Sequence, residues 1–102
     1  MESDRNWMVD FSTKAKGAAE RLKKDKPKAR ERLLTLVREI ERDGPIRKNW
    51  PNFGSIKGAE NDSYHCHFKK GRPVYVACWG IADKKTKRIE VYYVGTHEHA
   101  PY

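Results

Sequence analysis

Residues 64–94, YHCHFKKGRPVYVACWGIADKKTKRIEVYYV, contain three stretches typical of β-strands, separated by two charged turns. The strand stretches are rich in β-branched and aromatic residues, which favour the half-buried surface of a sheet. They cover residues 64–68, 74–81 and 88–94, and the turns cover residues 69–72 and 83–87. Two hairpins in series form a meander, so the sequence predicts a three-stranded antiparallel sheet.

The segment before the meander predicts a short strand and a first helix. Trp7–Phe11 is bulky and loosely alternating, which suits a strand, and Ser12 or Thr13 then offers an N-cap. Apolar residues at helical spacing predict the helix that follows. They form a narrow stripe of Phe11, Ala15, Ala18 and Leu22. Pro27 either breaks this helix or opens the next one at its first turn.

A second helix, expected from Ala29, carries the clearest apolar pattern in the chain. The pattern follows the i, i+3, i+4 and i+7 spacing of one helix face. It consists of Leu33, Leu36, Val37 and Ile40. Gly44-Pro45 stops this helix. Residues 46–62 contain Trp50, Phe53 and several turn-forming residues, which predicts an ordered loop whose aromatic side chains tuck against the core.

These elements predict an α+β fold in a single domain of residues 1–102. A chain of 102 residues and 11.9 kDa matches one domain with a core of modest size. One short strand, two helices and a meander predict helices packed on one face of a mostly antiparallel sheet. Cys66 and Cys78 lie in strand-like stretches, and two cysteines are too few for a disulfide scaffold, so reduced thiols used for packing are expected.

The charge balance favours a polyanionic partner. The chain has 22 Lys and Arg against 14 Asp and Glu, a formal net charge of +8, and its pI is about 9.6. Nucleic acid is the first partner class that this charge suggests, and an acidic protein is the second. No apolar run approaches the ~20 residues of a membrane span, and the first residues lack the apolar region of a secretory signal. A soluble, cytoplasmic protein with no membrane partner is therefore expected.

All four histidines lie in the last third of the chain, in YHCHF (64–68) and THEHAPY (96–102). On a strand, His65 and His67 point to one face while their neighbours point to the other. With residues 74–81 as the central strand, both are expected to share a shallow groove with His97. The cations expected at its rim are Lys69, Lys70 and Arg72.

Imidazoles among cations suit RNA cleavage by the internal 2′-hydroxyl. A neutral His takes the 2′-OH proton, a protonated His gives a proton to the leaving 5′-oxygen, and Lys or Arg stabilises the charge that develops on phosphorus. This chemistry requires no metal and no cofactor. We expect the neighbouring positive charge to lower the histidine pKa values, which keeps at least one ring neutral near pH 7.

Three less specific interpretations remain open at this point. Histidines on a basic strand surface are often merely solvated or hydrogen-bonded. Two His-x-His pairs also resemble a zinc ligand set, although no carboxylate or cysteine spacing supports one. The nine Lys and Arg between Lys14 and Arg32 either form a solvated helix face or follow a phosphate backbone.

The order of elements, with the motifs His65-Cys66-His67 and Gly95-Thr96-His97, resembles the RelE/ParE toxin superfamily, and its nearest branch is the YafQ-like mRNA interferases. The resemblance runs from about Phe11 to Tyr102. It implies a RelE-like fold and a toxin of a type II toxin-antitoxin system that cleaves mRNA in the ribosomal A site. It also implies a cognate acidic antitoxin.

The resemblance assigns roles residue by residue. His67 and His97 align with the family's catalytic histidines, and His65 occupies a position that is polar and usually acidic in the branch. Residues 69–72 replace a Pro-Asp-Trp-like segment. The implied catalytic set is His65, His67 and His97. The expected RNA or phosphate contacts are Lys69, Lys70, Arg72, His99 and Tyr102; of these, the resemblance itself implies Arg72 and Tyr102, the latter of which approximates the family's terminal aromatic residue.

Two other functions stay open. ParE-like members of the superfamily poison DNA gyrase and lack the catalytic cluster, so the histidines argue against that branch. A basic RNA-binding module without catalysis is the other possibility. For the toxin, the +8 charge opposes self-association, so we expect a monomer whose stable partner is an acidic antitoxin segment laid across the basic helices and the histidine face.

Overall fold

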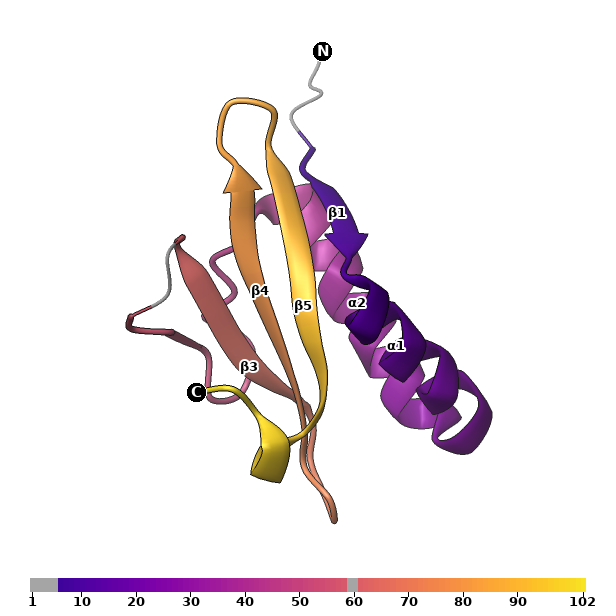
Figure 1. The fold of residues 1–102 in the computed structure, drawn as a ribbon. Coiled ribbons are helices and arrows are strands. Elements are labelled where there is room, and N and C mark those ends of the chain that lie inside the picture. Colours follow the sequence, from indigo (N-terminus) through magenta and orange to yellow (C-terminus); the bar gives the residue numbers. More distant parts are fainter. Residues whose placement is uncertain (1–5, 59–60) are drawn as a thin grey trace.

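A computed structural model describes residues 6–58 and 61–102. Figure 1 shows a curved sheet with a pair of helices packed beside it. The elements follow in the order β1 (Met8–Phe11), α1 (Thr13–Asp25), α2 (Pro27–Asp43), β2 (Gly54–Ser55), β3 (Ser63–Lys69), β4 (Tyr75–Asp83), β5 (Arg88–Thr96) and a short 3-10 helix η1 (His97–His99). The strands form one five-stranded sheet in the order β1-β5-β4-β3-β2.

The predicted meander is confirmed. β3 pairs with β4 and β4 pairs with β5, both antiparallel, while β1 lies parallel to β5 at one edge. The prediction of a loop over residues 46–62 is wrong at Gly54–Ser55, because these two residues form β2 against β3. So short a strand has no periodicity of its own, and its pairing comes from the long-range approach of the chain to the edge of β3.

The helices begin and end where capping residues allow. Ser12 is the N-cap of α1, where its side chain accepts a hydrogen bond of 3.1 Å from the Ala15 amide. α2 begins at Pro27, two residues before the predicted start, because the first helical position does not need the N–H that proline lacks. Gly44 ends α2 with a φ of 98°, a conformation that favours glycine.

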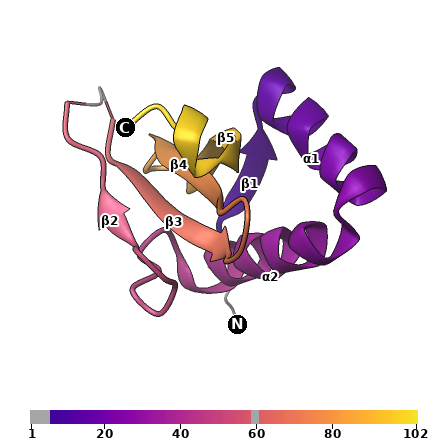
Figure 2. The ribbon, with the colours of Figure 1, turned by 90° about the horizontal axis from the view of Figure 1, so that it is seen from below.

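Both helices pack on one face of the sheet, as predicted (Figure 2). The predicted stripe of α2 is buried throughout. In α1 the buried residues are Ala15, Ala19 and Leu22; the predicted Ala18 is only half-buried, and Phe11 belongs to β1. Trp79 lies at the centre of the core with no exposed surface, and its Nε1 donates a hydrogen bond of 3.0 Å to the Pro45 carbonyl.

The loop aromatic residues and the cysteines also belong to the core. Trp50 is buried, and Phe53 stacks on Tyr64 with ring centroids 5.7 Å apart, which confirms the prediction for this loop. Cys66 and Cys78 are both free and buried, and burial raises the pKa of each thiol to about 12. They therefore act as small apolar side chains. No helix within the described ranges is long and apolar enough to cross a membrane.

Candidate active site

The register of the meander brings two histidines together on the sheet face that lies opposite the helices. His67 is opposite Val76 on β4, and Val76 is opposite Gly95 on β5, so these three residues form one row across the sheet. His97 follows two residues later, where its amide donates a hydrogen bond of 2.9 Å to the Val74 carbonyl. The rings of His67 and His97 then meet edge to face with centroids 5.1 Å apart. The expected convergence of these two side chains is therefore present.

His65 joins the same face through an aromatic stack. Its ring lies 3.9 Å from that of Tyr102, measured between centroids, and Tyr102 is also 6.3 Å from His97. This contact arises because the chain turns through η1 after β5 and runs back across the sheet toward β3 (Figures 1 and 2). The Nδ1 atom of His65 is buried without a hydrogen-bond partner, and an added Cβ at Gly54 would lie 3.1 Å from its Nε2 atom.

Burial controls the protonation of two of these histidines. Partial burial lowers the pKa of His65 and of His67, and the neighbouring imidazoles lower both pKa values further. The direction agrees with the sequence-based expectation; the larger cause is burial, and the charge that contributes comes from neighbouring histidines and not from Lys or Arg. His67 is consequently neutral near pH 7, as a general base must be. His97 is exposed to solvent.

A tyrosine fixes the backbone that presents His97. The Tyr93 hydroxyl donates a hydrogen bond of 2.7 Å to the Thr96 carbonyl, directly before His97. A Cβ added at Gly95 would lie 2.7 Å from that hydroxyl, so glycine makes room for the tyrosine ring. The Gly-Thr-His motif was evident in the sequence, but the sequence does not show why its first residue is glycine. The geometry explains it: a side chain at position 95 would displace the ring that holds the turn.

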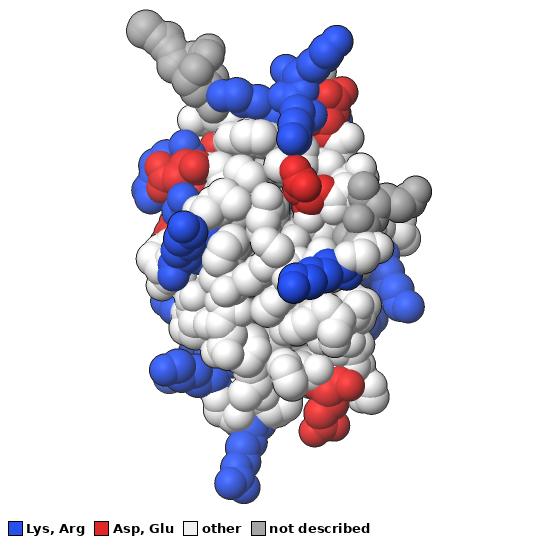
Figure 3. Space-filling model, turned by 90° about the vertical axis from the view of Figure 1, so that its left-hand side faces the viewer, with Lys and Arg blue, Asp and Glu red and all other residues white. Residues whose placement is uncertain are grey.

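The cations that were expected at the rim lie on both sides of the histidine pair. Lys69 and Lys70 line a hollow together with His67, and Arg72 lines a groove together with His97. His99 is exposed in η1, and Tyr102 is 45% exposed although it stacks on His65. Figure 3, which views the molecule from the β3 side, shows a broad uncharged area with Lys and Arg, and fewer Asp and Glu, around it.

Arg32 is a cation of this site that sequence reasoning did not single out. It lines the same hollow as His67, its Nε donates a hydrogen bond of 3.3 Å to the Phe68 carbonyl, and its guanidinium lies 4.6 Å from the centre of the Trp50 ring. These two contacts fix the Arg32 side chain in the wall of the hollow that His67 also lines. In the sequence it is one of nine cations between Lys14 and Arg32, and nothing in the helix pattern separates it from the rest.

The histidines do not form a recognisable metal site. Across residues 6–58 and 61–102, no group of three or more His, Cys, Asp and Glu side chains is placed to hold a metal ion. His65 instead contacts Tyr102, and His67 contacts His97. The arrangement offers one half-buried neutral imidazole, one exposed imidazole and nearby cations, which is a set of groups for proton transfer next to a phosphate.

Solved structures supply the comparison that places this fold. A dimer of YoeB from Staphylococcus aureus superposes with a TM-score of 0.71 at 14% identity, covering 90% of this chain and 98% of that one. The YoeB–YefM complex from the same organism gives a TM-score of 0.69 at 14% identity, covering 89% and 97%. The chain has the YoeB fold.

The YoeB fold is the RelE-like α+β fold that the sequence predicted. The finer placement in the YafQ-like branch receives no support from these neighbours. No family model matches the sequence. No curated protein matches it either.

The protonation state of His65 leads to a testable pH dependence of stability. Its folded-state pKa is lowered by burial, so the unfolded chain binds more protons as the pH falls below the ordinary value of ~6.5. The free energy of unfolding should therefore fall between pH 7.5 and pH 5. His65→Gln should reduce this fall, while His99→Gln, at an exposed position, should leave it unchanged. Denaturant titrations at both pH values measure the difference, and an equal fall in both variants would refute the role given to His65.

Proposed function

We propose that this protein is the toxin of a type II toxin-antitoxin pair in the RelE superfamily and that it cleaves mRNA on the ribosome. The observation that carries the proposal is the contact of His67 with His97, 5.1 Å apart, among cations on the YoeB fold. The resemblance of the sequence motifs to the RelE/ParE toxins points to the same function. A place in the cytoplasm, where ribosomes and mRNA are found, is part of the proposal.

The proposed reaction is transesterification within the RNA strand. His67 removes the proton from the 2′-hydroxyl, whose oxygen attacks the adjacent phosphorus. The bond from phosphorus to the 5′-oxygen then breaks, and His97 gives that oxygen a proton. The products are a 2′,3′-cyclic phosphate and a free 5′-hydroxyl. No water, metal ion or cofactor enters the balance of this step.

The remaining groups stabilise charge and hold the strand. Arg32 is held in the hollow that His67 also lines by its contacts with Trp50 and the Phe68 carbonyl, and its guanidinium is proposed to stabilise the negative charge that develops on the phosphoryl oxygens. His65 is proposed to support the site through its stack on Tyr102. The cationic side chains at positions 69, 70 and 72 and the exposed His99 are proposed as phosphate contacts.

The proposed partner is an acidic antitoxin. A neighbour in structure is the complex of YoeB with YefM, which shows that one protein of this fold binds a second chain. The formal charge of +8 on the present chain favours an anionic segment, and we propose that it covers the histidine face and the basic helices. The free protein is proposed to be a monomer.

The experiment that tests this function compares three substrates. Purified protein is incubated with ribosomes programmed with mRNA, with the same mRNA free in solution, and with supercoiling reactions that contain gyrase. We expect primer extension to show cleavage on ribosomes and little on free mRNA, with supercoiling unaffected. Gyrase inhibition without cleavage would favour the ParE-like alternative, and ribosome binding without either activity would favour a simple RNA-binding module.

Electrostatic contacts with RNA predict a steep salt dependence. Each cation-phosphate contact releases counterions, so Lys70→Gln or Arg72→Gln should weaken ribosome binding and flatten the plot of log affinity against log salt by up to ~1 each. The control is Lys85→Gln, because Lys85 lies on the β4–β5 turn at the far end of the sheet. Affinity measured from 50 to 300 mM salt that does not change would contradict the electrostatic account.

A further inference from the structure

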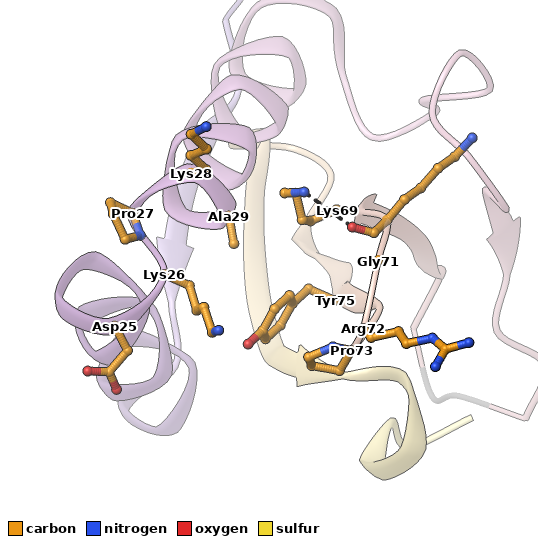
Figure 4. A pocket seen from close by; sticks show the side chains of 11 residues that line it. Asp25, Lys26, Pro27, Lys28, Ala29, Lys69, Gly71, Arg72, Pro73 and Tyr75 are labelled. Carbon is orange, nitrogen blue, oxygen red and sulfur yellow. Dashed lines mark hydrogen bonds between the residues drawn. The ribbon is translucent and has the colours of Figure 1, made fainter.

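A cavity lies on the helix side of the β3–β4 hairpin, away from the histidine face. Its volume is about 400 Å³, and it is lined by residues 25–29, where α1 joins α2, by residues 69–73 of the hairpin, and by Tyr75. We call it the hairpin pocket. Figure 4 shows the Tyr75 ring between the two walls, with the Lys26 side chain reaching toward it from the helix joint. Its volume is in the ~300–1,000 Å³ range of small-ligand sites.

The hairpin pocket combines apolar walls with an excess of positive charge. Pro27, Ala29, Pro73 and Tyr75 supply the apolar surface. Its charged side chains are one carboxylate and five cations, namely Asp25, Lys26, Lys28, Lys69, Lys70 and Arg72. Lys69 donates a hydrogen bond to the Lys70 carbonyl. Within the described part of the chain, the side chains of Lys26, Lys28, Lys70 and Arg72 make no ion pair.

Tyr75 is held as a flat platform. Its ring is half-buried and stacks on Phe68, with centroids 6.1 Å apart and an angle of 28° between the rings. Phe68 is almost completely buried, so it fixes the tyrosine from the core side. An oriented aromatic ring beside unpaired ammonium groups is the combination that binds single-stranded nucleic acid, in which bases stack and phosphates pair with cations.

The hairpin pocket shares lining residues with the two depressions that contain His67 and His97. Lys69 and Lys70 line this pocket and also the hollow that contains His67. Arg72 and Pro73 line it and also the groove that contains His97. Residues 69–73 of the β3–β4 hairpin therefore separate the pocket from the two histidine depressions, and the pocket shares part of this lining with each of them.

We propose that the hairpin pocket binds one nucleotide of single-stranded RNA close to the phosphodiester on which the histidine pair acts. The base or ribose packs on Tyr75 and the proline walls, and the phosphate pairs with Lys26. The placement of this nucleotide near the cleaved bond rests on the proposed function. The choice of a nucleotide as the ligand rests on the Tyr75 ring, the excess of cations and the residues that the pocket shares with the histidine depressions.

The test measures binding of a short single-stranded RNA by the full chain without ribosomes. The RNA carries 2-aminopurine, whose fluorescence is quenched when the base stacks. Tyr75→Leu should weaken binding by about 10-fold or more and abolish the quenching, because stacking contributes ~1–3 kcal/mol per base. Tyr75→Phe should keep both, since the ring is retained. Lys26→Gln, at an exposed position, should weaken binding and lower the salt slope by up to ~1.

Controls separate this inference from the proposed function. Lys85→Gln, on the far turn, should bind RNA as the unmodified protein does, and thermal unfolding checks that Tyr75→Leu is folded. Unchanged binding and quenching in Tyr75→Leu and Lys26→Gln would overturn the inference even if ribosome-dependent cleavage occurs. Tyr75-dependent quenching without any cleavage would support the pocket and refute the proposed function. In a competition experiment, poly-glutamate is added to the RNA complex. If it displaces the RNA and no quenching depends on Tyr75, the pocket binds an acidic peptide and the inference is overturned.

Discussion

His67→Ala and His97→Ala are each expected to lower ribosome-dependent mRNA cleavage by about 10²–10⁴-fold, the usual contribution of a general acid or base. The rings lie 5.1 Å apart, so one scissile phosphodiester can contact both. His67 is the expected base because burial lowers its pKa. If the two histidines act in one proton-transfer cycle, the fold-reduction in cleavage rate in the double variant should be much smaller than the product of the fold-reductions in the two single variants.

The matched control for this pair is His99→Ala, because His99 belongs to the same short helix as His97 and is equally exposed. It should retain most of the cleavage activity and lose only ribosome affinity. His67 and His97 are not part of the buried core, so their variants should unfold at nearly the same temperature as the unmodified protein. Full cleavage by either alanine variant would exclude that residue from the chemistry.

Trp79→Ala is expected to lower the free energy of unfolding by ~3–5 kcal/mol, the usual cost of removing a large buried aromatic side chain. Trp79 has no exposed surface, and its indole links the central strand to the Pro45 carbonyl just beyond the end of α2. Both the cavity and the lost hydrogen bond contribute to the expected change. Denaturant titration measures it directly.

Trp79→Phe is the control that separates these two contributions. It keeps most of the apolar volume and leaves the Pro45 carbonyl without its donor, so the expected loss is clearly smaller than that of the alanine variant. If the two variants were equally unstable, the hydrogen bond rather than the packing would dominate. Stability unchanged in Trp79→Ala would contradict the placement of this side chain at the centre of the core.

Strand alternation made much of the site predictable. Because the side-chain period of a strand is two, His65 and His67 had to share a face, and the order of the hairpins had to place β4 between β3 and the segment that ends in His97. The same argument predicted that Cys66 would face the helices, and it lies in the core cluster. The second helix was predictable because its four apolar positions match one helical face.

Features that depend on distant contacts or on the conformation of a side chain were not predictable from the sequence pattern. The parallel pairing of β1 with β5 and the short β2 are set by tertiary packing. The hydrogen bond from Tyr93 to the Thr96 carbonyl requires the tyrosine ring to lie over Gly95. The spacing of residues in the sequence does not predict this position of the ring. Arg32 differs from the other helix cations only because Trp50 and the Phe68 carbonyl lie next to it. The strand pairings and the Arg32 contacts join segments that are distant in the sequence, whereas the Tyr93 hydrogen bond is local and depends on how its side chain is turned.

The central claim is attack by the RNA 2′-hydroxyl with proton transfer by His67 and His97. The most direct measurement uses ribosomes programmed with an mRNA that carries one 2′-deoxynucleotide at the mapped cleavage site, alongside the all-ribose message. Mass spectrometry identifies the ends of the products. We predict a 2′,3′-cyclic phosphate and a 5′-hydroxyl from the all-ribose message, and no cleavage at the deoxy position. Cleavage at the deoxy position, or products with a 3′-hydroxyl and a 5′-phosphate, would contradict the account.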